Sequence, residues 1–138
     1  MHAETTPDLS SLDLETVVVD ARGLDPYLRQ TGRFRMLDGV LYEDPAAGLA
    51  VGYKDIRGED WWAQDHVPGR PMFPGALQIE AAAQLASYDY SVHRLEGPLP
   101  EDKFVGFGGV EKARFRRAVL PDCKLILTSQ LILSLIHI

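Results

Sequence analysis

Three prolines spaced three residues apart lead directly into an apolar, alanine-rich stretch near the middle of this chain. Pro68, Pro71 and Pro74 each fix their backbone φ angle near −65°, so the loop that carries them is stiff. Proline suits a first helical position, and the stretch opened by Pro74 and Gly75 predicts a helix of about 15 to 19 residues. Nearly all of its faces are apolar or small. We therefore expect a buried central helix.

This region carries two groups suited to proton transfer. His66 precedes the proline loop, and Glu80 lies among small apolar residues of the predicted helix. An imidazole and a carboxyl group together indicate acid–base chemistry, but a histidine beside a turn also serves in hydrogen bonding, and Glu80 also suits the solvated edge of an apolar face. Gln84 follows one turn after Glu80 and shares its face, as a helix contact would also require. The residues alone leave both interpretations open.

Short apolar and β-branched segments surround the predicted helix. They predict strands at 33–37, 40–42, 48–55, 103–119 and 122–132, with a loop at 58–65. A helix enclosed by antiparallel strands is an α+β arrangement. We expect one domain at 15–132, preceded by a mobile tail at 1–14.

Composition narrows the function classes. The chain has 138 residues, of which 46% are hydrophobic, and its apolar runs are too short to span a membrane. Its formal net charge of −6 disfavours nucleic acid as a partner, and its histidines lack metal-ligand spacing. Cys123 is the single cysteine, and the polar start of the chain has no signal-peptide pattern. We expect a cytoplasmic protein.

Two sequence blocks carry a family resemblance. Residues 66–84 read HVPGRPMFPGALQIEAAAQ and closely resemble the active-site segment of the 3-hydroxyacyl-ACP dehydratases of the FabZ/FabA type, H-F-P-x-x-P-x-x-P-G-x-x-x-x-E/D with a glutamine four residues later. Residues 104–119 read FVGFGGVEKARFRRAV and are similar to the family's F-x-G-I-x-x-A-R-F-R-R-P-V strand pair, and 33–51 are similar to its opening hairpin. The resemblance covers 27–132 in the family's order.

The chain departs from the family pattern around the acyl pocket. Val67 replaces a phenylalanine, Phe73 replaces the usual methionine, and Trp61 and Trp62 stand where paired phenylalanines are common. These exchanges put the acyl chain-length preference in doubt. The acid Glu80 resembles the FabZ type more than the FabA type, which usually has aspartate.

The resemblance implies the hotdog fold, in which an antiparallel sheet wraps around a central helix. It implies reversible dehydration of 3-hydroxyacyl-ACP to trans-2-enoyl-ACP in fatty acid biosynthesis, without a metal or organic cofactor. His66 would be the base at C2, Glu80 would protonate the departing hydroxyl, and the Gly75 N–H would stabilise the enolate oxygen. The positions that would orient the substrate or the acid are Phe73, Pro74 and Gln84.

The resemblance also implies two partners. One is a second copy of the chain, since the family takes its histidine and acid from opposite subunits of a homodimer, and a trimer of dimers is compatible with this. The other is acyl carrier protein, an acidic partner that needs a local basic patch. Candidate docking residues are Lys112, Arg114, Arg116, Arg117 and Lys124. On a strand, Arg114 and Arg116 would share a face, although a solvated strand face explains them equally well.

Other functions stay open. The chain also fits a hotdog acyl-CoA hydratase or thioesterase, or a non-catalytic acyl-binding subunit, although the set His66, Gly75, Glu80 and Gln84 argues against the last.

The final six residues are interpreted separately. Residues 133–138, LSLIHI, equal the translation of CTG TCT CTT ATA CAC ATC, which resembles a transposon-end sequencing adapter. We therefore expect 133–138 to be non-native and the dehydratase domain to be C-terminally truncated, with an unpaired apolar sheet edge, poor solubility and weak activity.

Overall fold

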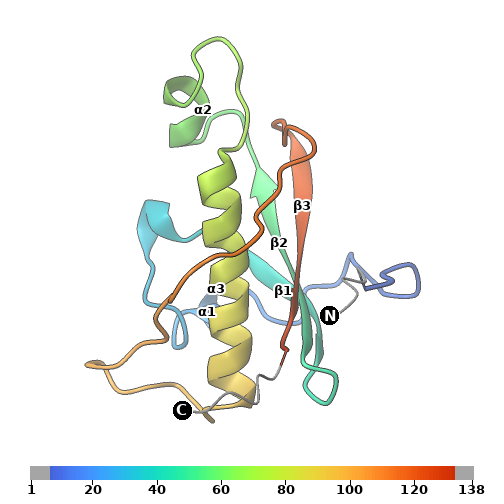
Figure 1. Ribbon diagram of the computed structural model, residues 1–138, viewed down its shortest axis with the longest axis vertical. Helices are drawn as coiled ribbons and strands as arrows, with labels where there is room; N and C mark the ends of the chain where they lie inside the picture. The colour runs from blue at the N-terminus through green and yellow to red at the C-terminus, as the bar shows by residue number, and fades with distance from the viewer. Residues whose placement is uncertain (1–6, 133–138) are drawn as a thin grey trace.

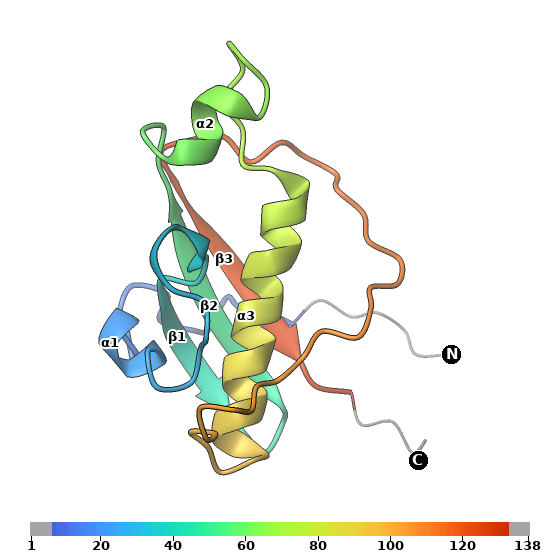
Figure 2. The same cartoon turned by 90° about the vertical axis from the view of Figure 1, so that its left-hand side faces the viewer.

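One long helix, α3 (Gly75–His93), lies against one face of an antiparallel sheet (Figures 1 and 2). The computed structural model describes residues 7–132. The first six residues of the expected tail and the whole adapter-like segment 133–138 therefore lie outside the described residues. The expected α+β arrangement is confirmed.

Three strands form the sheet in the order β1–β2–β3: β1 (Gly39–Asp44), β2 (Leu49–Ile56) and β3 (Cys123–Gln130). The central strand β2 pairs with β3 without interruption, from Leu49 opposite Gln130 to Ile56 opposite Cys123. Its pairing with β1 shifts register between Val40 and Tyr42. The strands predicted at 40–42, 48–55 and 122–132 are therefore confirmed in position.

The hydrophobic core lies between α3 and the sheet. Ala81, Leu85 and Tyr88 recur at helical spacing on the sheet side of α3 and are buried, whereas Ala76, Ala86 and Tyr90 are exposed. Gly52 of β2 packs closely against this core: an added Cβ would lie 3.1 Å from Leu85 Cδ1 and 2.8 Å from Leu37 Cδ1. A side chain at this position would separate the helix from the sheet.

Three short helices complete the described elements. α1 (Ala21–Leu24) begins at Asp20, whose side chain accepts a hydrogen bond from the Gly23 N–H. η1 (Gly32–Phe34) precedes β1, and α2 (Trp61–Asp65) precedes the proline loop. The segment 58–65, predicted as a loop, therefore contains a helical turn. Within residues 7–132, no helix is long and apolar enough to cross a membrane.

The strand predicted at 33–37 is wrong. The backbone N–H groups of Met36 and Leu37 donate to the side-chain oxygen of Gln84, at 2.8 and 3.1 Å. Because a helix side chain takes these donors, they are not available to a neighbouring strand.

The strand predicted at 103–119 is also wrong. This segment is irregular and runs along the side of α3 away from the sheet, returning from the C-terminal end of the helix towards its N-terminal end (Figure 2). Lys112 has a φ of 56°, which is incompatible with extended backbone. Three glycines at 106, 108 and 109 add a further entropic cost to strand formation.

Candidate active site

His66 lies at the junction between α2 and the proline loop. It caps the C-terminal end of α2, where its backbone N–H donates to the Trp62 carbonyl at 3.0 Å. Its side-chain Nδ1 lies 3.4 Å from the carbonyl oxygen of Met72, across the loop. The side chain is exposed. The imidazole is therefore oriented from both ends of the loop while it remains accessible.

His66 and the start of α3 line the same pocket, which we call the His66 pocket. Its volume is about 350 Å³, and its lining residues are His66, Met72, Phe73, Gly75, Gln78, Phe115, Arg116, Arg117 and Ala118. Gly75 is the first residue of α3, so its N–H has no acceptor within the helix. An imidazole, a helix N-terminus and two guanidinium groups thus surround one space, which suits developing negative charge.

Glycine at position 75 is also required by space. A Cβ added there would lie 3.0 Å from Cε1 and Cζ of Phe115. The irregular segment therefore packs directly over the first turn of α3. A larger residue at position 75 would displace either this segment or the helix start.

Phe73 and Pro74 connect the loop to the rest of the fold. Phe73 is buried, and its ring meets that of Trp62 edge-on with centroids 5.2 Å apart. Its backbone N–H donates to Val119 at 2.8 Å, and its carbonyl accepts from Gln78 Nε2 at 3.2 Å. Pro74 then caps α3 with a φ of −59°. These contacts fix where α3 begins.

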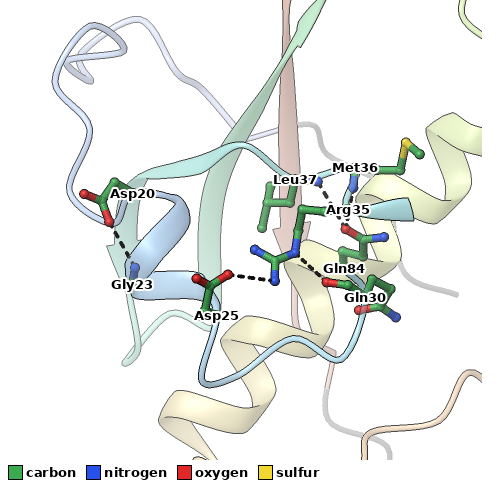
Figure 3. A network of polar contacts seen from close by, with 8 residues as sticks. All are labelled: Asp20, Gly23, Asp25, Gln30, Arg35, Met36, Leu37 and Gln84. Carbon is green, nitrogen blue, oxygen red and sulfur yellow. Dashed lines mark hydrogen bonds and ion pairs between the residues drawn. The ribbon is translucent and has the colours of Figure 1, made fainter. Parts of the chain in front are cut away.

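Gln84 holds Glu80 in place. Its Nε2 donates to Glu80 Oε1 at 2.9 Å and to the Phe34 carbonyl at 2.8 Å. Its Oε1 accepts from the backbone N–H groups of Met36 and Leu37, as Figure 3 shows. Gln84 is 1% exposed, so all of its hydrogen bonds are internal. The half-buried Glu80 therefore has one oxygen engaged and one left for other partners.

Arg35 connects the segment that contains Met36 and Leu37 to the end of α1. Arg35 forms an ion pair with Asp25 at 3.1 Å and donates through Nε to the Gln30 carbonyl at 2.9 Å (Figure 3). The backbone that receives Gln84 is thus fixed from both sides.

The structure brings together part of the predicted site. His66, Phe73, Gly75, Arg116 and Arg117 line the same pocket, whereas Glu80 is not among the residues that line it. Glu80 and Gln84 form a separate polar pair further along α3.

The predicted basic patch is divided. Lys112 and Arg114 are exposed outside the His66 pocket. Lys124 lies on β3, where its Nζ donates to the Leu14 carbonyl at 3.0 Å and lies 4.7 Å from the Tyr53 ring centroid. The expected strand face shared by Arg114 and Arg116 is wrong, because the segment is not a strand.

Two cations that the motif did not indicate have unusual environments. Arg29 donates to the carbonyls of Leu99, Pro100 and Lys103, at distances from 2.6 to 3.2 Å. Lys54 is buried at 7% exposure. Its position was visible in the sequence, because it shares strand parity with Ala50 and Ile56 on the apolar side of β2.

Comparison with known proteins assigns the chain to a protein family. The FabA-like domain family matches residues 28–134. A curated relative from Moorella thermoacetica, a 3-hydroxyacyl-[acyl-carrier-protein] dehydratase FabZ, is 38% identical over 99 residues, which is 72% of this chain and 66% of that protein. FabZ of Clostridium novyi is 40% identical over 89 residues (64% and 58%), and FabZ of Desulfotalea psychrophila is 35% identical over 116 residues (83% and 74%).

The long helix on an antiparallel sheet, with the histidine loop at the start of that helix, is the arrangement of a hotdog domain. The chain belongs to the FabA-like domain family. It spans slightly less than two thirds of the Moorella relative and 58% of the Clostridium relative.

Proposed function

We propose that this protein catalyses the reversible dehydration of 3-hydroxyacyl thioesters carried on acyl carrier protein to trans-2-enoyl thioesters, in fatty acid biosynthesis. The observation that carries this proposal is the His66 pocket, in which an accessible imidazole and the first N–H of α3 face a common space. Similarity to the FabZ relatives supports the same reaction.

Each step of this reaction has a group suited to it. His66 removes the proton at C2, and the Gly75 N–H, aided by the α3 dipole, stabilises the enolate oxygen of the thioester. Glu80 gives a proton to the C3 hydroxyl, which leaves as water. Gln84 directs the Glu80 carboxyl through their 2.9 Å hydrogen bond. None of these steps calls for a metal or organic cofactor.

We further propose that the complete site forms in a homodimer, with His66 of one chain opposite Glu80 of the other. The separation of Glu80 from the His66 pocket within one chain supports this arrangement. A trimer of dimers would preserve the same pairing. The single cysteine, Cys123, is exposed and free, which suits a reducing compartment such as the cytoplasm.

Acyl carrier protein is the proposed partner at the pocket mouth. Arg116 and Arg117 line the His66 pocket, and Lys112 and Arg114 are exposed on the same segment. Such local positive charge would attract an acidic carrier despite the net charge of −6. Reversing Lys112 and Arg114 to glutamate should slow turnover of carrier-bound substrate and spare a small thioester analogue.

The test of the reaction uses matched variants. We expect His66→Ala and Glu80→Gln each to lower turnover by about 10²- to 10⁴-fold. Both variants should remain folded, which is checked by a cooperative thermal unfolding transition in circular dichroism. Controls are His93→Gln, at the opposite end of α3, and Glu59→Gln, an exposed residue. Turnover close to wild type in either test variant would contradict the mechanism.

The same assay separates the other candidate functions. Carrier-bound and CoA-bound 3-hydroxyacyl substrates are supplied in parallel, and enoyl formation and free thiol are followed separately. Enoyl product only from CoA substrates indicates a hydratase, and free thiol without enoyl product indicates a thioesterase. Binding of the acyl carrier without either product indicates a non-catalytic subunit.

A further inference from the structure

Gln78 is a polar residue of the His66 pocket that none of the proposed steps uses. It lies in the first turn of α3, three residues after Gly75, and its side chain is half-buried. The family pattern H-F-P-x-x-P-x-x-P-G-x-x-x-x-E/D leaves this position open. The role of Gln78 therefore follows from its own contacts in this chain.

One end of the Gln78 carboxamide is fixed by the fold. A polar atom of this group lies 3.2 Å from the Phe73 carbonyl oxygen, and because a carbonyl only accepts, that atom is the donor Nε2. Phe73 is itself held by the contact of its ring with Trp62 and by the hydrogen bond from its N–H to Val119. Since the nitrogen and oxygen of a carboxamide diverge from one carbon atom, Oε1 is directed away from the Phe73 carbonyl.

The other end of the carboxamide, Oε1, is an available acceptor. Among residues 7–132 it has no hydrogen-bond partner, and it is not a buried atom, because the buried side-chain polar atom without a partner in this range is Asp89 Oδ1. The other described residues that line the pocket have no side-chain oxygen, and two of them carry guanidinium groups. Gln78 Oε1 is thus the side-chain oxygen that this pocket offers to a ligand N–H or O–H.

The proposed substrate has two donors near its thioester. The C3 hydroxyl is assigned to Glu80, which the proposed homodimer supplies from the opposite chain. The second donor is the amide N–H of the arm that holds the thioester sulfur, separated from the sulfur by an ethylene unit. With the thioester oxygen at the Gly75 N–H, residue 78 lies about 4.5 Å further along the helix axis. This distance is comparable with the span from the thioester carbonyl to the amide N–H.

We propose that Gln78 selects thioesters whose arm carries an amide N–H, by accepting a hydrogen bond from this group through Oε1. The inference rests on the proposed dehydratase function and adds to it a specificity-determining residue that contacts the arm, away from the reacting carbons. The same arm occurs in thioesters of acyl carrier protein and of CoA. Gln78 therefore recognises the class of thioester and does not distinguish the two carriers.

Two unreactive ligands test this hydrogen bond. The hexanoyl thioester of N-acetylcysteamine carries the arm amide N–H but no C3 hydroxyl, so it binds without turnover. Its N-methyl analogue keeps both carbonyl groups and lacks the N–H. Binding of each ligand to the full chain is measured by isothermal titration calorimetry. We expect the wild-type chain to bind the N–H ligand about tenfold more tightly than the N-methyl ligand.

Matched variants assign this preference to Gln78. Gln78→Met removes the acceptor but keeps a side chain of similar length, and the preference for the N–H ligand should be lost in it. The added methyl group is present in the comparison for every variant, so its steric effect does not account for a change in the ratio of the two affinities. Gln64→Met changes an exposed residue of α2 outside the pocket and should keep the wild-type ratio.

Several results would overturn the proposal. These are equal binding of the two ligands by the wild-type chain, no measurable binding of the N–H ligand, or a preference that persists in a folded Gln78→Met variant. The wild-type comparison needs no variant, so it decides the question even if Gln78→Met does not fold.

The proposed reaction is assayed separately, with the 3-hydroxyhexanoyl thioester of N-acetylcysteamine as substrate. A ligand preference without enoyl formation would refute the proposed reaction and leave the role of Gln78 in binding. Enoyl formation without a ligand preference would refute the role of Gln78 and leave the reaction.

Discussion

Gln84 shows how one side chain can serve both the fold and the site. It makes four hydrogen bonds, three of them to the backbone of the segment before β1 and one to Glu80. A buried amide with this many partners fixes the rotation of α3 relative to that segment. It thereby also determines the direction in which Glu80 points.

We predict that Gln84→Met destabilises the protein strongly. The substitution leaves the N–H groups of Met36 and Leu37 buried without acceptors, at a cost of about 1–3 kcal/mol for each unsatisfied group. Urea denaturation measures the change in unfolding free energy. Gln78→Met is the control, since Gln78 donates a single hydrogen bond, to Phe73. Equal losses of unfolding free energy in Gln84→Met and Gln78→Met would contradict this account.

Asp89 is a second residue whose environment has a measurable effect, in this case on the pKa of its carboxyl group. It is 5% exposed, and its Oδ1 has no hydrogen-bond partner among residues 7–132. Burial raises the pKa of this carboxyl above its ordinary value, and Glu43 adds to the rise, while His93 at 3.7 Å and Arg94 oppose it. The folded protein therefore holds the Asp89 proton more tightly than the unfolded chain does.

This pKa difference predicts a pH-dependent stability. Between the ordinary pKa of 3.8 and the raised pKa of Asp89, this carboxyl group binds a proton more often in the folded state than in the unfolded state. The contribution of Asp89 to the free energy of unfolding therefore falls as the pH rises through this interval. Asp89→Asn should raise Tm at pH 7 by roughly 2–5 °C, with no gain at a pH below 3.8. Thermal melts of Asp89→Asn and of the exposed control Asp102→Asn test this. A lower Tm for Asp89→Asn at pH 7 would contradict it.

At the scale of elements, the irregular segment after α3 is fixed at its two ends. Arg29 binds the carbonyls of Leu99, Pro100 and Lys103 near the C-terminal end of α3. Near the other end, the Val119 carbonyl accepts the Phe73 N–H at 2.8 Å. The stretch between these anchors follows the helix without strand pairing, as Figure 1 shows.

We predict that Arg29→Met releases the first of these anchors. Trypsin should then cleave after the exposed Lys103 faster than in wild type, because local opening exposes the backbone to the protease. Arg22→Met, an exposed substitution in α1, is the matched control. An unchanged cleavage rate after Lys103 would show that Arg29 does not hold the segment.

Strand and helix predictions succeeded or failed for identifiable reasons. The pattern at Pro74 and Gly75 predicted α3 because its signals are local, and the same holds for β2 and β3. The segment 103–119 has the composition of strands, but a strand also needs a partner edge, which composition does not report. At Met36 and Leu37 the competing acceptor is Gln84, almost fifty residues away.

The site was predictable to a similar extent. Motif spacing indicated that His66 and Gly75 belong to one site, and the structure brings them into one pocket. The side chains around Lys54 come from segments far apart in the sequence, such as the one that carries Asp38, and only the folded chain shows that they lie near it.

At the scale of the whole molecule, apolar surface gathers on the irregular segment. Phe104 is 71% exposed and Phe107 is 63% exposed, and Val110 and Phe115 are also exposed. Grouped exposed aromatic residues mark interaction surfaces or aggregation sites. The proposed homodimer would cover this surface.

We predict that this apolar surface drives self-association. The wild-type chain should form dimers or larger species in light scattering, and the double variant Phe104→Ser/Phe107→Ser should shift it towards monomer. Phe34→Ser removes a similarly exposed ring elsewhere and should leave the distribution unchanged. A wild-type chain that stays monomeric over the accessible concentration range would refute this prediction.

The Arg29 anchor has a consequence for sequence variation. Its guanidinium recognises only main-chain oxygens at positions 99, 100 and 103, so the identities of the side chains there are irrelevant to the contact. Substitutions at these positions that preserve the local backbone path should be tolerated, while Arg29 itself is not replaceable by a shorter cation with a single ammonium group. Because Arg29 binds main-chain oxygens, its hold on the segment after α3 does not depend on which side chains that segment carries.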